Sequence, residues 1–323
     1  MENAIAKYST VELDWIPIDA YEDGNCGIPY VWSYASSTSG PHLMICGIVH
    51  GNEIAGAIAL DRLLQSGIRP VRGRLTFCFA NPDAYARFDP SQPTASRHVD
   101  QDLNRLWALD VLDGCAESVE IRRARALRPL IDDVDALLDI HSMQGEGRPV
   151  AVAGGNPKAL ALAMQLPSPN FVVSGELHDA TMLRLRDYGR FSHLNDDATA
   201  LQIEAGQHWQ KQTADTAYDI ALGIIDLYRM APEDFRPNAT ETSHTHVQIS
   251  EHVYTSSDHF RFVDDFANGD CIDKTGTVIG YDDDTPVATP YDQCYLVMPV
   301  QFRKRGGRAV SLAKSCPVTR SIA

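Results

Sequence analysis

The sequence predicts an α/β protein with a mixed, mostly parallel sheet flanked by helices, followed by a small all-β domain. Short, nearly all-apolar runs alternate with segments of helical periodicity over the first 230 residues, and this alternation is typical of parallel sheets covered on both faces. After Met230 the periodicity ends, and β-branched residues, aromatic residues, glycine and proline dominate. We therefore expect a larger domain over residues 1–230, a linker over 231–238 and a β domain over 238–323.

Each expected element follows from its own pattern. The run Leu43–Val49 predicts a buried strand, and apolar residues then recur at helical spacing from Ile54 until Gly67 ends the helix. Apolar runs predict further strands at 75–80, 136–140, 150–153, 170–173 and 201–203, and helical periodicity predicts helices at 117–130 and 214–230. Because ligands of such sheets bind at the carboxyl ends of the strands, polar residues at these ends are candidates for a site.

Composition and charge exclude several classes of protein. Hydrophobic residues make up 44% of the 323 residues and charged residues 22%, which is typical of a soluble globular protein. No apolar run approaches the roughly 20 residues that cross a bilayer, and the first residues show no secretory signal, so we expect a cytoplasmic protein without a membrane partner. The net charge of −15 without a basic stripe argues against nucleic acid. Seven scattered cysteines without a C-x-x-C pair fit a reducing compartment.

Two histidines stand at the ends of predicted strands. His50 closes the strand 43–49 and Glu53 begins the following helix, so both side chains can reach the carboxyl edge of the sheet. His141 closes the strand 136–140 in the same way. Singly, each histidine could bond to the backbone and the glutamate could merely favour a helix N-terminus. Together they supply the three protein ligands of a typical catalytic zinc site, and we expect one zinc ion per chain.

Two further segments carry charged residues suited to catalysis. In Arg97-His98-Val99-Asp100-Gln101-Asp102-Leu103-Asn104-Arg105, the adjacent Asn104 and Arg105 can bind a carboxylate, and Arg97 can stabilise an oxyanion. Glu204 ends a predicted strand just before Gly206, and a carboxylate beside a metal can be the general base of amide hydrolysis. Without a metal, a solvated charged loop and an exposed edge-strand glutamate would be the plainer interpretation.

These four segments, in this order, resemble the motifs of the succinylglutamate desuccinylase/aspartoacylase family, a branch of the zinc carboxypeptidase superfamily. The family motif H-G-[ND]-E matches residues 50–53, R-x-x-D-x-D-L-N-R matches 97–105, D-[LI]-H matches 139–141 and E-x-G matches 204–206. The resemblance covers residues 40–230 well and extends loosely into the β domain. It implies a zinc-carboxypeptidase-like fold whose metal is bound by His50, Glu53 and His141.

The resemblance also implies roles for the other motif residues. Glu204 would be the base, Arg97 would polarise the scissile carbonyl, and Asn104 and Arg105 would bind the α-carboxylate of the substrate. With these roles the sequence predicts a zinc-dependent amidohydrolase that removes the acyl group from a small N-acylated amino acid and releases a carboxylate and a free amino acid. The β domain would cap the active site.

The chain departs from the family at two positions. Aspartoacylases have an arginine about ten residues before the catalytic glutamate that binds the side-chain carboxylate; here Leu194 stands there, next to His193, and Arg190 lies slightly earlier. Tyr295 is the counterpart we assign to a family tyrosine that enters the site from the C-terminal domain. We expect Arg190 and Tyr295 to bind substrate, and selectivity for aspartate stays open.

Two other functions stay open from the sequence. A metallocarboxypeptidase would use the same residues on a C-terminal peptide bond but needs an open groove, and a non-catalytic metal-binding protein would need neither the arginines nor Glu204. A second group of histidines allows a further metal site, although a polar β surface is the simpler interpretation; its members are His244, His246, His252 and His259. The sequence leaves open the acyl group, the amino acid and the oligomeric state, including a homo-oligomer.

Overall fold

The N-terminal part of the protein is a mixed, mostly parallel sheet, as expected. The structure is a computed structural model that describes residues 10–176, 182–236, 243–301 and 304–317. The strands of this part are β1 (Val31–Ala35), β2 (His42–Gly47), β3 (Arg74–Phe79), β4 (Ala136–Met143), β5 (Val150–Gly154), β6 (Phe171–Ser174) and β7 (Thr199–Gln207). They lie in the order β1-β3-β2-β4-β7-β5-β6. The β1–β3 and β5–β7 pairs are antiparallel, and the other neighbours are parallel.

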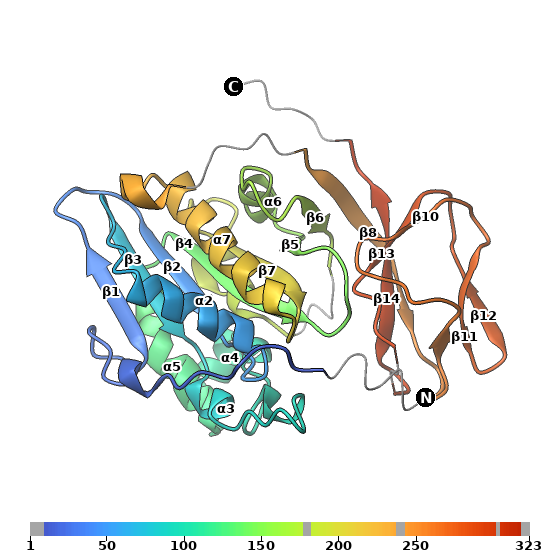
Figure 1. The fold of residues 1–323 in the computed structure, drawn as a ribbon, viewed down its shortest axis with the longest axis horizontal. Coiled ribbons are helices and arrows are strands. Elements are labelled where there is room, and N and C mark those ends of the chain that lie inside the picture. The colour runs from blue at the N-terminus through green and yellow to red at the C-terminus, as the bar shows by residue number, and fades with distance from the viewer. Residues whose placement is uncertain (1–9, 177–181, 237–242, 302–303, 318–323) are drawn as a thin grey trace.

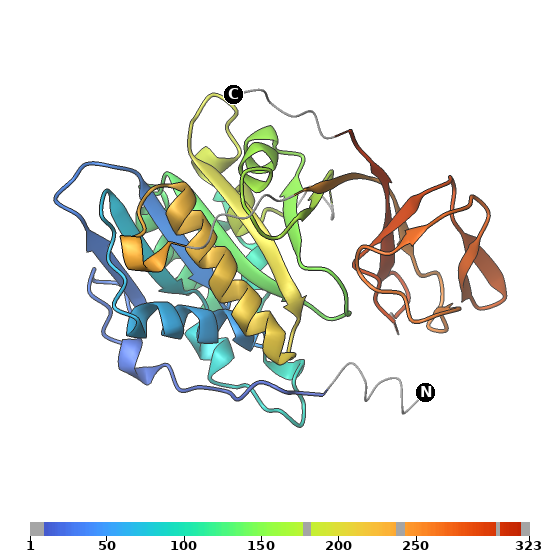
Figure 2. The same cartoon turned by 45° about the horizontal axis from the view of Figure 1, so that its top comes forward.

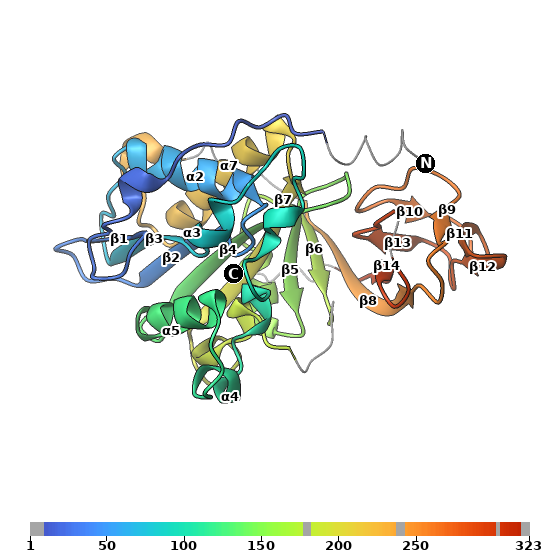
Figure 3. The same ribbon diagram turned by 90° about the horizontal axis from the view of Figure 1, so that it is seen from below.

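Helices cover both faces of this sheet. Figure 3 shows α2 (Ile54–Gln65) and α7 (Lys211–Leu227) on one face and α5 (Val119–Ile131) with the short α4 (Leu109–Leu112) on the other. The remaining short helices are α3 (Pro82–Tyr85), α6 (Pro157–Ala163), η1 (Asp19–Tyr21), η2 (Ala95–Arg97), η3 (Leu103–Arg105), η4 (Leu185–Asp187), η5 (Gly189–Phe191) and η6 (Glu233–Phe235). None of the helices in the described ranges is long and apolar enough to cross a membrane.

Burial on both faces explains the continuous apolar runs. Consecutive residues of a strand point to opposite faces, and in β4 Leu138 packs in the cluster under α2 and α7 while Leu137 packs in the cluster under α5. All eight residues of β4 are buried. The sheet is therefore a rigid platform, and its carboxyl edge positions whatever side chains follow the strands.

The C-terminal part consists of strands that continue the same sheet. β8 (Thr245–Tyr254) pairs in parallel with β6 and antiparallel with β14 (Arg308–Ser315), and β13 (Cys294–Val297) and β10 (Cys271–Ile272) follow. A separate small sheet contains β9 (Arg261–Phe262), β11 (Val278–Asp282) and β12 (Thr285–Ala288). β8 runs from one part into the other (Figures 1 and 2). Because hydrogen bonds cross the expected boundary, the division at residue 238 stays a prediction, and residues 237 and 238 of the expected linker lie outside the described residues.

Candidate metal centre and substrate cavity

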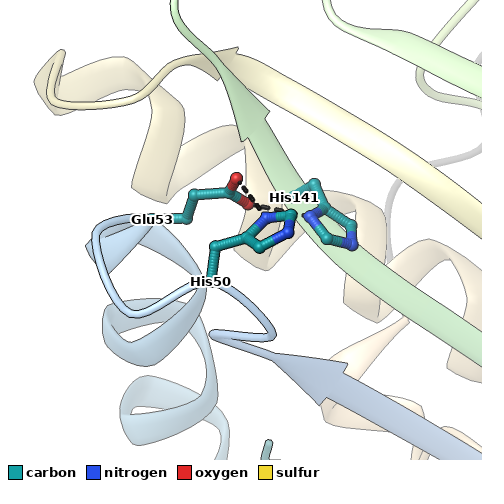
Figure 4. Close-up of side chains that lie close together, drawn as sticks. All are labelled: His50, Glu53 and His141. Carbon is teal, nitrogen blue, oxygen red and sulfur yellow. Dashed lines mark hydrogen bonds and ion pairs between the residues drawn. The ribbon is translucent and has the colours of Figure 1, made fainter. Parts of the chain in front are cut away.

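Three donor side chains converge at the carboxyl edge of the sheet. His50 and Glu53 lie in the turn between β2 and α2, and His141 lies near the end of the neighbouring β4 (Figure 4). Their donor atoms all lie within 4.8 Å of one another. His50 Nδ1 is 2.7 Å from Glu53 Oε1, and His141 Nδ1 is 2.9 Å from Glu53 Oε2. Two imidazoles and a carboxylate are a donor set that catalytic zinc uses, so these residues fit the metal that the sequence predicts.

The turn that carries His50 and Glu53 is tightly packed. A Cβ atom at Gly51 would overlap the backbone of Ala84 and Tyr85, and the Gly51 N–H donates to the carbonyl of Arg97 at 3.1 Å. Only glycine fits such a close backbone approach. The glycine of this motif therefore ties the metal-donor turn to the segment that begins at Arg97.

Each imidazole is oriented by a carboxylate on its other ring nitrogen. His50 Nε2 lies 3.0 Å from Asp102 Oδ1, and His141 Nε2 lies 2.9 Å from Asp139 Oδ2. Such partners orient the rings, and with its proton on Nε2 a neutral imidazole would present the lone pair of Nδ1 to a bound cation. Both aspartates belong to the motifs in the sequence, but no role was predicted for either; Asp139 could have been assigned because alternate residues of a strand share a face, and it lies two residues before His141.

The buried charges of the donor set stabilise one another. Burial disfavours charged Glu53, yet His50 and His141 outweigh it and hold the pKa of Glu53 well below its usual value. Burial likewise disfavours charged His141, but Asp139 and Glu53 raise the pKa of His141 well above its usual value. All three donors are at most 4% exposed. Three carboxylates, those of Glu53, Asp102 and Asp139, thus contact the two imidazoles, and such buried carboxylates favour a bound divalent cation.

Glu204 stands beside the donor set on the next strand. In the parallel β4–β7 pair, Glu204 is the register partner of His141. Its Oε1 accepts a hydrogen bond from Gln202 Nε2 at 2.9 Å. Burial, with help from Glu53, raises the pKa of Glu204 to about 8, and a cation bound nearby would lower it. The carboxylate is thus close to the metal donors without being one of them.

The segment 97–105 brings its three predicted polar side chains into the same cavity. Arg97 Nη2 donates to Asp102 Oδ2 at 3.0 Å, and Arg97 Nη1 lies 3.7 Å from Glu53 Oε1. Asn104 Nδ2 lies 3.3 Å from His141 Nε2. Arg105 Nη1 donates to the Asn104 carbonyl at 2.7 Å, and burial lowers the pKa of Arg105. All three residues line the cavity onto which the metal donors open.

This segment is held from behind by the first turn of α5. The Glu120 carboxylate accepts hydrogen bonds from the backbone N–H groups of Val99, Asp100 and Gln101 at 2.6, 3.0 and 3.1 Å. In return, Asp100 Oδ2 accepts from Val119 N at 2.8 Å. Although burial opposes it, the three N–H groups lower the pKa of Glu120. The ionised side chain therefore fixes the backbone that presents the cavity arginines.

Glu120→Gln is expected to lower kcat/KM by about tenfold or more while the zinc content stays unchanged. The amide keeps the shape of the side chain but loses the charge that three N–H donors share, and small misplacements of catalytic groups can cost about 100-fold in rate. Steady-state kinetics and metal analysis measure both. Glu117→Gln, an exposed carboxylate bonded to Arg125, is the control. Unchanged kinetics with only a lower melting temperature would contradict this positioning role.

Two predicted substrate residues are not among those that line the cavity. Arg190 binds Asp196 at 3.0 Å and Asp135 at 3.6 Å. Asp135 directly precedes β4, so Arg190 sits at the edge of the sheet opposite His141. Tyr295 packs against Phe171, with ring centroids 6.1 Å apart, in the cluster that also contains Met143 and Met298 of the cavity. Substrate contact by Tyr295 stays a prediction, and the position of Arg190 does not support such a contact.

A different arginine occupies the cavity. Arg184 lines it and is 3% exposed. Its Nη1 lies 3.3 Å from Asp187 Oδ2, while Nε and Nη2 are buried without a hydrogen-bond partner among the described residues. Burial and the neighbouring Arg186 lower its pKa to about 10, so it remains charged at neutral pH. A buried cation with unused donors is costly unless an anion binds there.

The second group of histidines, His244, His246, His252 and His259, is not among the described residues that have metal-binding geometry. Three of them have other partners: His244 Nε2 contacts the Leu166 carbonyl, His246 Nε2 contacts Ser174 Oγ, and His252 Nδ1 contacts Ser311 Oγ, all at 2.9 Å. Across the described residues, His50, Glu53 and His141 form the only donor group with metal-binding geometry.

One cavity histidine was not predicted from the sequence. His208 lines the cavity, and its Nδ1 lies 2.8 Å from Ser142 Oγ.

Comparisons with known proteins find relatives of the family that the motifs resemble. Residues 39–164 match the family model of the succinylglutamate desuccinylase/aspartoacylase catalytic domain. A protein of Parasynechococcus marenigrum named "Probable aspartoacylase" is 32% identical over 132 residues, which are 38% of this chain and 41% of that protein. A succinylglutamate desuccinylase of Pseudomonas fluorescens is 38% identical over 73 residues, 21% of this chain and 19% of the relative. The chain thus matches less than half the length of these curated relatives.

Solved structures share the fold over most of the chain. The succinylglutamate desuccinylase of Vibrio parahaemolyticus superposes with a TM-score of 0.63 at 19% identity, covering 89% of this chain and 86% of its own. A succinylglutamate desuccinylase/aspartoacylase of Rhodobacter sphaeroides gives 0.65 at 16% identity, covering 90% and 89%. Over residues 39–164 the chain thus matches the catalytic-domain model of the family that the motifs indicate. The matched segment includes the metal donors and Arg97 to Arg105 and ends before Glu204.

Proposed function

We propose that this protein is a zinc-dependent amidohydrolase that removes an acyl group from an N-acylated amino acid. The observation that carries the proposal is the pairing of the donor set with Glu204: a carboxylate that is not a donor lies in register with His141 on the adjacent strand. A protein that only binds metal has no use for such a carboxylate or for the arginines around it. Their presence together favours catalysis over storage or sensing.

The chain's own residues suit the steps of amide hydrolysis. Zinc, when bound by His50, Glu53 and His141, supplies the Lewis acidity that activates water and polarises the scissile carbonyl. Glu204 takes the proton of the attacking water at Oε2, because Oε1 already accepts from Gln202, and then passes the proton to the departing amine. The guanidinium of Arg97 balances the negative charge that develops on the carbonyl oxygen.

The charged wall of the cavity indicates which part of the substrate is anionic. Asn104 and Arg105 lie where they can bind the α-carboxylate of the amino acid. Arg184 adds a buried cation whose Nε and Nη2 have no hydrogen-bond partner among the residues that the structure describes. We therefore propose that the amino-acid part carries a second acidic group, such as the side chain of aspartate or glutamate.

Access to the cavity favours a small substrate over a peptide. Tyr254, Met298, Val300 and Arg308 line the cavity from the C-terminal part. A carboxypeptidase would need room there for the chain on the N-terminal side of the scissile bond. A panel of N-acetyl, N-succinyl and N-formyl amino acids, assayed beside short peptides with zinc present, tests the proposal. Hydrolysis of peptides alone would reassign the protein as a carboxypeptidase.

Arg105→Ala is expected to raise KM mainly, whereas Arg97→Ala is expected to lower kcat mainly. The substrate carboxylate bound by Arg105 is charged in both the ground state and the transition state. The oxyanion met by Arg97 exists only in the transition state, and groups that stabilise it are worth about 10² to 10³ in kcat. Initial-rate kinetics on one substrate measure both. The reverse pattern would contradict these roles.

Arg184→Leu is expected to raise KM for N-acyl aspartate or glutamate by about 10- to 100-fold, because a hydrogen bond to a charged group contributes about this factor to binding. The KM for the matching N-acyl alanine should change little, because that substrate lacks the second carboxylate. Arg190→Leu is the matched control, since its partners Asp135 and Asp196 lie at the opposite edge of the sheet. An equal effect on acidic and neutral substrates would refute the assignment.

A further inference from the structure

His208 is a cavity residue to which the proposed function so far gives no role. It lines the cavity and is 6% exposed. Its Nδ1 lies 2.8 Å from Ser142 Oγ, whereas Nε2 has no hydrogen-bond partner among the residues that the structure describes. Buried polar atoms are almost always paired. A ligand in the cavity can supply the partner that Nε2 lacks.

The contact with Ser142 determines which ring nitrogen of His208 carries the hydrogen. Within the described part of the chain the Ser142 hydroxyl contacts only Nδ1, so it donates its hydrogen there and the imidazole keeps its own hydrogen on Nε2. Burial lowers the pKa of His208 to about 4, although Glu53 opposes this, and a cation bound nearby would lower it further. The ring is therefore neutral and presents one uncharged N–H donor to the cavity.

The backbone around His208 is fixed before any ligand binds. His208 N donates to the Met143 carbonyl at 2.9 Å. The next residue, Trp209, is fully buried; its Nε1 donates to the Asn52 carbonyl at 3.0 Å and its backbone N donates to Gln207 Oε1 at 2.8 Å. A donor that is already held in place loses little conformational entropy when it binds a ligand.

His208 belongs to a different side of the cavity from the arginines that would bind carboxylates. Those arginines lie on two segments that are joined by a hydrogen bond from Leu185 N to Asn104 Oδ1 at 3.0 Å. His208 instead bonds to the end of β4, where Met143 packs with Met298 of the C-terminal part. A substrate with its carboxylates on the arginines and its scissile carbonyl at the metal donors therefore directs its acyl group toward His208.

We propose that His208 is a substrate-binding residue, which donates a hydrogen bond from Nε2 to an oxygen atom of the acyl group. This role presupposes the proposed deacylase function. The contact requires only an oxygen acceptor, which every acyl group has in its carbonyl, and it sets no length or charge for the rest of the group. Ser142 is then a positioning residue, because its hydroxyl keeps the imidazole hydrogen on Nε2.

Asparagine and glutamine at position 208 separate the roles of the two ring nitrogens. The amide of asparagine reaches the position of Nδ1, and that of glutamine reaches the position of Nε2. On the N-acyl amino acid that the wild type hydrolyses best, His208→Gln should keep kcat/KM within about threefold. His208→Asn should lower it by about tenfold, because a buried hydrogen bond is lost. A loss in His208→Asn that does not exceed the loss in His208→Gln would overturn the proposal.

Inhibition by the free amino acid that the reaction releases locates the contact on the acyl group. This product has no acyl group, so its inhibition should be the same in the wild type and in both variants. Weaker inhibition of His208→Asn would place the contact on the amino-acid part and overturn the proposal. His246→Asn is the matched control and should change neither measurement, because His246 also contacts a serine hydroxyl, that of Ser174 at 2.9 Å, but does not line the cavity.

Failure of the proposed function is distinguishable from failure of this contact. If the zinc-loaded wild type hydrolyses no N-acyl amino acid, the deacylase proposal fails. Calorimetric titration of N-acetyl glutamate into the wild type and the two His208 variants then tests the contact by itself. Binding that is about tenfold weaker in His208→Asn alone supports the contact, and any other pattern, or absent binding, overturns it.

Discussion

His141→Ala is expected to lose most of its zinc and to lower activity by more than about 100-fold. Mutation of residues that only hydrogen-bond to metal ligands already lowers metal affinity or activity by about 10- to 100-fold, and loss of a ligand should have a larger effect. His141 supplies one of only two imidazoles in the donor set, and Asp139 orients it at 2.9 Å. Elemental analysis of protein purified without chelator measures the metal, and the same preparation measures turnover.

His252→Ala is the matched control for this change. His252 is also a partly buried histidine on a strand, but its imidazole contacts Ser311 in the C-terminal part. Its removal should change neither zinc content nor rate. A His141→Ala protein with full zinc content and full activity would show that the metal, if present, binds elsewhere.

Glu204→Gln is expected to keep zinc and fold but to lower kcat by a factor of about 10² to 10⁴, the usual contribution of a general base to the rate. The amide is nearly isosteric and cannot accept the proton from water. Zinc content should stay at the wild-type value because Glu204 is not among the three donors. Glu251→Gln, an exposed glutamate on β8, controls for the loss of one charge. Activity within a few-fold of wild type would place the base elsewhere.

The central sheet and the metal donors were predictable because their signals are local. Strands buried on both faces read as continuous apolar runs, and His50 and His141 directly follow or end such runs. The edge strand β1 gave no comparable run, because only Val31 is fully buried and its other residues are half-buried or exposed. The seven-residue α6 is too short for a clear helical period.

The positions of the predicted substrate residues depend on how loops fold, which spacing alone does not determine. Arg184 lies twenty residues before Glu204, and η4, η5 and the turns after them fill the intervening chain. A spacing of about ten therefore pointed to Leu194, which is 65% exposed, and to Arg190 at the wrong edge of the sheet. In the same way, the pairing of β8 with β6 joins segments some seventy residues apart, and no local pattern predicts such a contact.

We propose that this chain hydrolyses N-acyl amino acids with zinc held by His50, Glu53 and His141. The release of free amino acid from N-acyl glutamates tests this proposal when one preparation is measured before chelation, after chelation and after addition of zinc. We expect activity that disappears with the chelator and returns at one zinc ion per chain. Activity that survives complete removal of metal, or a zinc-loaded protein that releases no amino acid from any substrate of the panel, would contradict it.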